Sequence, residues 1–143
     1  MTIKLIPLGY IKVWTDPANV LAGPGPIHQR SISVFKRVQW KSDTFTFDTH
    51  LGMGGFMAGP LVAQVDVRVA LKDADGVRLF LDYVSRTDII AHTKGEAPAY
   101  LCGRVDVDDA NEKYAWLNRT QIVGKGEFDT KEHAVVYEVY ALE

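Results

Sequence analysis

Hydrophobic and polar residues alternate along much of this chain, with the two-residue period of a β-strand. In residues 61–71 one face holds three valines and a leucine, while the other face includes Gln64, Asp66 and Arg68. The sequence Lys-Asp-Ala-Asp-Gly at residues 72–76 then supplies a turn before a second strand-like run. This arrangement predicts a β-hairpin.

Comparable patterns predict further strands at residues 3–14, 31–40, 44–48, 77–85, 100–107, 114–121 and 135–142. No window shows a sustained helical stripe, and no repeat period appears. About eight to ten short strands with turn signals between them predict an all-β sandwich or barrel. Closure into an antiparallel barrel is favoured because several strands are apolar on one face and mixed on the other. Polar side chains pointing inward favour a hollow barrel with a small internal cavity.

Two segments are predicted to be irregular. Residues 16–26 hold three prolines and two glycines, and residues 51–60 hold four glycines and two methionines. Glycine-rich sequence is a poor regular element in isolation. The second segment is therefore expected to be either a flexible rim over a pocket or a loop tucked under Phe56 and Met57.

The stretch at residues 114–126, YAWLNRTQIVGKG, combines aromatic, amide and cationic side chains in one short run. If it is a strand, Trp116 and Asn118 share one face with Tyr114, and Arg119 lies on the other. Each face then mixes apolar surface with a hydrogen-bonding group. Both faces are therefore expected to be covered by other parts of the molecule.

Composition places the chain among ordinary globular proteins. Its 143 residues are 47% apolar and 24% charged, which fits one domain with a single core. The net charge of −2 gives no basic footprint, so nucleic acid and membrane partners are not expected.

The N-terminus lacks a signal-peptide pattern and the chain has one cysteine, Cys102. These two features together predict a cytoplasmic protein. Cys102 is expected to be a small buried side chain.

The motif Tyr-x-Trp-Leu-Asn-Arg at residues 114–119, followed by Ile-Val-Gly at residues 122–124, resembles the signature of the domain-of-unknown-function 3237 family. The hairpin within residues 65–81 and the closing residues 135–142 are similar to that family as well. The resemblance implies a single-domain, calycin-like antiparallel β-barrel that often forms a homodimer. It implies no particular activity.

A site can be proposed from the polar residues that a barrel would bring together. If Asp66 and Arg68 point inward, Asp66 is a candidate general base, and Arg68 or Tyr83 can polarise a carbonyl oxygen. His50 is a further catalytic candidate because it lies between a strand and the glycine-rich segment. The alternative is an ion pair between Asp66 and Arg68 on an exposed face.

Ligand-binding roles are predicted for Trp116, Asn118, Arg119, Phe56 and Met57, with the glycine-rich segment at the cavity mouth. The alternative for Trp116 is a core anchor, because burial of its ring stabilises the fold. Arg119 and Asn118 can equally satisfy a neighbouring loop.

No metal, cofactor or covalent nucleophile is predicted. The four histidines lack the spacing of a metal site, and residues 106–113 lack the glycine and terminal glutamate of a calcium loop.

Three functions remain open. The first is a cofactor-independent acid-base enzyme of the lyase, isomerase or cyclase type acting on a small carbonyl-bearing or aromatic compound. The second is a barrel that only binds such a compound, and the third is a structural or dimeric subunit.

Overall fold

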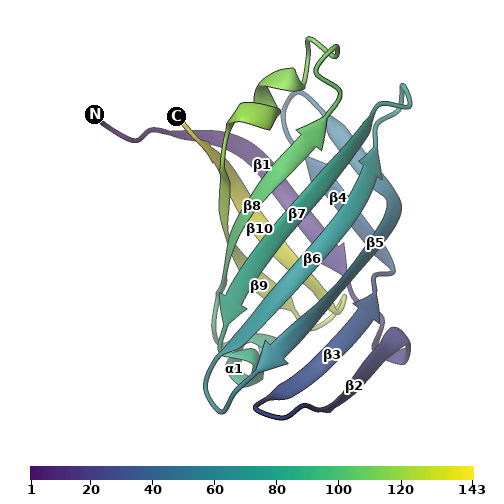
Figure 1. The fold of residues 1–143 in the computed structure, drawn as a ribbon, viewed down its shortest axis with the longest axis vertical. Coiled ribbons are helices and arrows are strands. Elements are labelled where there is room, and N and C mark those ends of the chain that lie inside the picture. Colours follow the sequence, from purple (N-terminus) through teal and green to yellow (C-terminus); the bar gives the residue numbers. More distant parts are fainter.

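The computed structural model describes residues 1–143, apart from the side chains of Asn19 and His50. Across this described chain, ten strands form one antiparallel sheet (Figure 1). The strands are β1 (Leu5–Trp14), β2 (Val20–Pro24), β3 (Gln29–Val34), β4 (Arg37–Lys41), β5 (Thr46–Ala58), β6 (Ala63–Lys72), β7 (Arg78–Thr87), β8 (Ala99–Val107), β9 (Ile122–Asp129) and β10 (Ala134–Leu142). The helical segments are η1 (Pro17–Asn19), α1 (Ile89–Thr93) and η2 (Ala115–Arg119). None of these described helices has the length and hydropathy of a membrane span.

The sheet closes on itself, which confirms the predicted all-β antiparallel barrel. Neighbouring strands follow the order β5-β4-β1-β10-β9-β8-β7-β6, and β6 pairs with β5 to complete the circle. The predicted hairpin is the β6–β7 pair, in which Val67 opposes Tyr83. Closure leaves the eight barrel strands without a free edge and places alternate side chains inside.

The hairpin of β2 and β3 extends one side of the barrel. Strand β3 pairs with the second half of β5, whereas β4 pairs with residues 46–48 at its start. The single strand predicted at residues 31–40 is therefore wrong, because Phe35 and a bend at Lys36 separate β3 from β4. Half of the irregular connection predicted at residues 16–26 is also strand β2.

The glycine-rich segment is not a loop. It continues β5 as far as Ala58 and pairs with β3 on one side and β6 on the other. Its glycines weaken a strand in isolation, but two flanking strands supply the hydrogen bonds that hold it extended. The prediction of a flexible rim is therefore wrong.

The strand predicted at residues 114–121 is wrong as well. This stretch forms the short helix η2, and the next strand begins at Ile122. Tyr114 and Leu117, three residues apart, are both buried. That spacing brings two side chains to one side of a 3-10 turn, and the flanking loop residue Asn111 accepts hydrogen bonds from the first backbone amides of the turn.

Aromatic side chains fill the end of the barrel beneath η2. Phe47 and Tyr114 lie with ring centroids 5.0 Å apart, and Phe45 packs edge-on to Trp40 at 5.3 Å. The Trp40 indole donates a hydrogen bond to the Leu8 carbonyl at 2.7 Å. These edge-to-face contacts fill the interior beneath η2, which lies at the upper end of the barrel in Figure 1.

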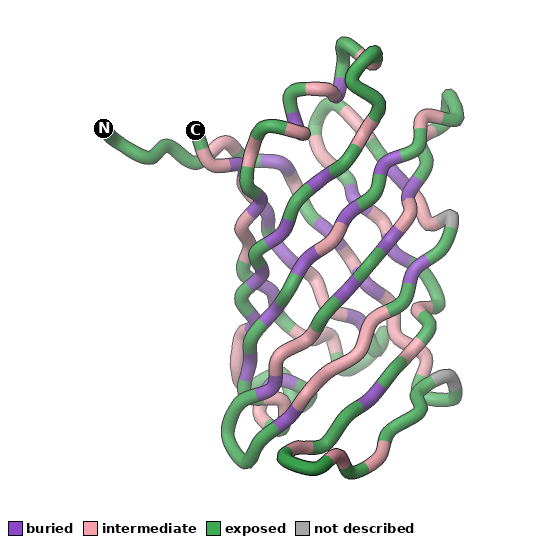
Figure 2. Tube along the Cα trace, viewed as in Figure 1, coloured by how far each residue is buried: buried purple, intermediate pink, exposed green. Residues whose placement is uncertain are grey.

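The opposite end is less filled. Figure 2 shows buried segments along the upper and middle parts of the strands, and half-buried segments toward the lower ends of β5 and β6. Val65 and Phe56, which are paired across these two strands, are both only half-buried. Helix α1 lies at this lower end of the barrel (Figure 1). The interior is therefore packed at one end and hollow at the other.

Candidate ligand cavity

A cavity of about 180 Å³ occupies the lower half of the barrel interior. Its walls come from both sides of the barrel and from α1, and they include Phe35, Phe56, Val65, Phe128 and Val135. Most of this surface is apolar. The polar residues of the lining are serines, threonines, two tyrosines and two histidines, and the positions of these groups define what the cavity can hold.

Two tyrosines form the inner wall of the cavity, where it meets the packed half of the barrel. The rings of Tyr83 and Tyr137 lie 5.7 Å apart in an edge-to-face arrangement, and both are buried. Gly126 on the adjacent strand makes room for Tyr137, because a Cβ at that glycine would lie 2.5 Å from the tyrosine Cδ1. The small residue is thus required by the close approach of the ring.

A hydrogen bond between hydroxyl groups joins Tyr137 on β10 to Ser85 on β7. The Tyr137 hydroxyl donates to Ser85 Oγ at 3.1 Å, and Ser85 is 1% exposed. Burial, followed by the influence of Tyr137, raises the pKa of the Tyr83 phenol well above its ordinary value. Burial likewise raises the pKa of Tyr137. Both phenols are therefore neutral at physiological pH and act as hydrogen-bond donors.

Helix α1 brings His92 to the cavity. The carboxylate of Asp88 caps the helix by accepting from the Ala91 amide at 3.1 Å. After the helix, Gly95 adopts a positive φ of 76°, which turns the chain back toward the ring. The Ala97 carbonyl then lies 2.8 Å from His92 Nδ1.

The other ring nitrogen of His92 has no such partner. His92 is 3% exposed, and among the described residues no group hydrogen-bonds its buried Nε2 atom. The ring lines the cavity and packs edge-on to Phe128 at 5.7 Å. Since a carbonyl only accepts hydrogen bonds, Nδ1 carries the proton, and in the neutral ring Nε2 is an acceptor.

Charged side chains are absent from the described lining of this cavity, which contains no Asp, Glu, Lys or Arg. In the described chain, no group of three or more His, Cys, Asp or Glu side chains is arranged to hold a metal ion. The cavity therefore presents hydroxyl groups and the imidazole rings of His92 and His133 on an otherwise mostly apolar lining.

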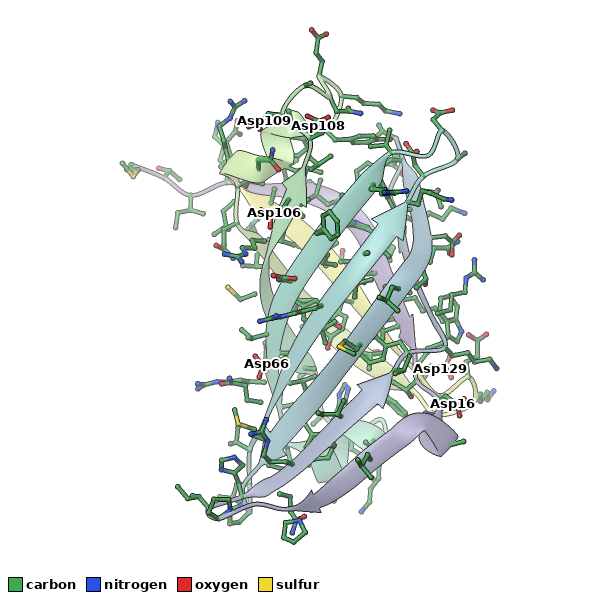
Figure 3. All side chains as sticks on the ribbon, turned by 45° about the vertical axis from the view of Figure 1, so that its right-hand side comes forward. Asp16, Asp66, Asp106, Asp108, Asp109 and Asp129 are labelled. Carbon is green, nitrogen blue, oxygen red and sulfur yellow. The ribbon has the colours of Figure 1, made fainter. Side chains whose placement is uncertain are left out.

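The predicted acid and cation lie outside this enclosure. Asp66 and Arg68 are exposed on the outer face of β6, opposite to Val65 and Val67, and Figure 3 shows Asp66 on the outside of the barrel wall. The expectation that they point inward is wrong, because the valines take the buried face of the alternating strand.

Asp66 and Arg68 border an outer groove of about 530 Å³ together with Arg104 and Cys102. Cys102 is exposed there and not buried as expected. The described ion pair in this groove joins Arg104 to Asp82 at 3.5 Å, with the arginine side chain 70% exposed. Such an exposed pair contributes little to stability.

The remaining predicted residues are divided among three places. Tyr83 and Phe56 line the cavity, as expected of residues that handle a ligand. Met57 lies across the wall, in a second outer hollow of about 340 Å³ that includes Arg30 and Asp66. The side chain of His50 lies outside the described residues. A single cavity bordered by all of these residues does not form.

The signature residues Trp116, Asn118 and Arg119 belong to η2, at the end of the barrel opposite the cavity. Asn118 accepts from the Val107 amide and donates to the Val107 carbonyl, both at 2.8 Å, so its side chain fastens η2 to the end of β8. Trp116 is 38% exposed at an outer groove, and Arg119 is exposed. None of the three lines the internal cavity, so their predicted place in its wall is wrong.

The cavity residues that the sequence predictions missed include His92, Ser85 and Tyr137. A signal for His92 was present, because Asp88 followed by two isoleucines and later by Gly95 is the pattern of a short capped helix. The pairing of Ser85 with Tyr137 joins residues 52 positions apart and has no local signal.

The family whose description is "Protein of unknown function (DUF3237)" matches residues 3–142. The chain belongs to this family. The match confirms the family that the sequence resembles and covers nearly the whole chain. No functionally curated protein matches the chain.

Solved structures share the fold of this DUF3237 protein at low sequence identity. A β-barrel-like protein from Acinetobacter baumannii AYE is 20% identical, with 100% of this chain and 98% of that chain covered and a TM-score of 0.82. A conserved protein of unknown function from Rhodopseudomonas palustris is 15% identical, with 100% and 99% covered and a TM-score of 0.85. An enzyme from Penicillium herquei is 12% identical, with 99% and 94% covered and a TM-score of 0.70. These similarities establish the barrel and leave its function open.

Proposed function

We propose that this DUF3237 protein binds a small, uncharged and largely apolar molecule inside the barrel. The observation that carries the proposal is the cavity of about 180 Å³ inside the barrel, whose lining is mostly apolar. A ligand of matching size would pack against this apolar lining.

The volume of the cavity limits the size of the ligand. An apolar protein cavity of about 150 Å³ can accept one benzene molecule. The cavity of about 180 Å³ in this barrel therefore suits a single ring with one small substituent. A larger ligand would require the lining residues to move.

The lining limits the charge of the ligand. Transfer of an ion from water to a closed apolar site is costly unless an opposite charge compensates it. The described lining offers hydroxyl groups, the imidazoles of His92 and His133, and no Asp, Glu, Lys or Arg side chain. A ring bearing a carbonyl or a hydroxyl group is therefore favoured over a carboxylate or an amine.

The binding test compares four molecules that share one ring. Cyclohexanone and cyclohexanol are neutral, whereas cyclohexanecarboxylate and cyclohexylammonium are charged. Ligand-observed NMR and calorimetry should show binding of at least one neutral ring, at least about tenfold tighter than that of either ion. Equal affinity for the ions, or no binding of either neutral ring, would contradict the proposal.

A matched pair of variants locates the binding site. Val65→Phe adds a ring to the cavity lining and should abolish binding of the neutral ring. Val84→Phe makes the same change on the exposed outer face of the barrel and should leave binding unchanged. Circular dichroism and thermal unfolding would confirm that both variants are folded. If Val65→Phe binds as well as the unmodified protein, the ligand lies elsewhere.

A further inference from the structure

We infer that His133 lies at the mouth of the cavity and accepts a hydrogen bond from the hydroxyl group of a bound phenol. The inference rests on the proposed function and names the ligand class for the same site. It selects a hydroxyl group over a carbonyl group, and an aromatic ring over a saturated one.

The mouth of the cavity is marked by the lining residues that solvent reaches. Among the described lining residues, the exposed ones are Val20 at the start of β2, Thr93 in α1 and His133 in the turn between β9 and β10. His92 lies deeper and is 3% exposed. His133 therefore carries the imidazole that a ligand entering the cavity can reach.

The backbone of His133 has an unusual conformation that is held by hydrogen bonds. Its φ is 55°, in the left-handed region that is unfavourable for residues other than glycine. The amide of Thr15 donates to the His133 carbonyl at 3.0 Å, and the Thr15 hydroxyl donates to the same oxygen at 2.9 Å. The His133 ring packs edge-on to Phe128, with ring centroids 5.2 Å apart. The ring is thus positioned before a ligand arrives.

The Thr15 hydroxyl also sets the tautomer of the His133 ring. A hydroxyl group has one hydrogen, and Thr15 gives it to the His133 carbonyl. The hydrogen bond between Thr15 Oγ1 and His133 Nδ1 must therefore take its hydrogen from Nδ1. In the neutral ring Nε2 is then an acceptor, and no hydrogen bond in the described part of the chain engages it.

Most side-chain hydroxyl hydrogens of the described lining are already used within the protein. The lining residues whose hydroxyl donates to a backbone carbonyl or to another hydroxyl are Thr15, Ser33, Thr87, Thr93 and Tyr137. The other hydroxyl groups belong to Ser31, Tyr83 and Ser85, which are 5%, 4% and 1% exposed. The free hydrogen-bonding group at the mouth is therefore the acceptor on His133, which requires a ligand with a donor.

The wall of the cavity favours an aromatic ring. Phe35, Phe56 and Phe128 line it together with the two tyrosines. Edge-to-face contacts with such rings stabilise an aromatic ligand beyond the effect of burying its area. A phenol is one ring with one small substituent, and its hydroxyl supplies the hydrogen that Nε2 lacks.

The test compares phenol with fluorobenzene, which has the same kind of ring and a substituent of similar size but no donor hydrogen. NMR titration should show that phenol binds at least about fivefold more tightly than fluorobenzene. Cyclohexanol, which shares the hydroxyl group but not the aromatic ring, should bind more weakly than phenol.

A matched pair of variants assigns the difference to His133. Asparagine tolerates a positive φ, so His133→Asn keeps the backbone and removes the imidazole. It should lower the affinity for phenol by at least about fivefold and change that for fluorobenzene by less than about twofold. His28→Asn, on the β2–β3 turn and outside the described cavity lining, should change neither affinity.

The outcomes separate the two proposals. Binding of phenol, with the loss in His133→Asn confined to phenol, supports both. The inference is overturned, and the binding function stands, if fluorobenzene or cyclohexanol binds as tightly as phenol. The same holds if folded His133→Asn keeps its affinity for phenol or loses affinity for both aromatic rings equally. Absence of binding by every neutral ring overturns both proposals.

A second measurement covers a His133→Asn variant that does not fold. ¹⁵N NMR of the unmodified protein should show His133 protonated at Nδ1 and not at Nε2, with an Nε2 shift on addition of phenol and none on addition of fluorobenzene. The opposite tautomer, or no shift with phenol, would overturn the inference.

Discussion

The ring of Phe35 lies in the space that a side chain at Gly54 would need. A Cβ built on Gly54 would stand 2.6 Å from Phe35 Cζ and 2.9 Å from the Asp66 carbonyl oxygen. Phe35 comes from the bend between β3 and β4, and its ring also lines the cavity. The absence of a side chain at Gly54 in β5 therefore leaves room for the ring of Phe35, which comes from outside that strand.

The first prediction follows from this contact. Gly54→Ala should destabilise the protein by about 1–3 kcal/mol, because the new methyl group overpacks a filled site. Gly23→Ala, where no atom lies within 4 Å of the built Cβ, should change the stability by less than about 0.5 kcal/mol. Urea denaturation measures both. Equal stability of the two variants would show that Phe35 moves away without cost.

The second prediction concerns the hydroxyl chain. Tyr137→Phe removes the hydrogen bond to Ser85 within the barrel and should cost about 0.5–1.5 kcal/mol. Tyr140→Phe on the same strand removes the bond to exposed Glu138 and should have a smaller effect. Thermal and urea unfolding of the two variants make the comparison. A larger loss from Tyr140→Phe would contradict the importance of the buried pair.

The third prediction concerns alkaline unfolding. The folded-state pKa of Tyr83 lies well above its ordinary value of 10.0 because the phenol is buried. The raised folded pKa gives stability that is complete below the unfolded value and is lost as the pH rises toward the folded value. Above about pH 10, each such tyrosine lowers the free energy of unfolding by about 1.4 kcal/mol per pH unit.

Tyr83→Phe should therefore flatten the fall of stability above pH 10, whereas Tyr100→Phe, at an exposed position, should leave the slope unchanged. Urea denaturation at several alkaline pH values, together with phenolate absorbance, gives the slope. A Tyr83→Phe curve parallel to that of the unmodified protein would show that Tyr83 does not control alkaline stability.

Self-association remains a prediction. Phe80 and Val84 are exposed on the outer face of β7, where apolar side chains gain from being covered. Sedimentation at high micromolar concentration should show a dimer, and Val84→Glu should shift it toward monomer. Ile27→Glu, on the exposed β2–β3 turn, is the matched control and should leave the dimer intact. A protein that stays monomeric throughout would contradict the prediction.

The amino-acid sequence by itself determined the class of fold and the faces of its clearest strands. In β6 valines alternate with polar and charged residues, so burial alone decides which face points inward. A shift of one residue would expose every valine. The DUF3237 family could also be predicted from the sequence, and the family match over residues 3–142 confirms it.

Only the tertiary structure decided which residues meet inside the barrel. Asp66 was placed inward from its chemistry, yet its neighbours in β6 take the buried face. The glycines of β5 were taken for a loop, because neither Phe35 nor the two flanking strands can be seen within that segment. His92 meets the Tyr137–Ser85 pair only because barrel closure brings α1, β7 and β10 around one space. Local pattern specifies the direction of a side chain within its strand, whereas the partners across the barrel depend on strand order and register, which are set by long-range packing.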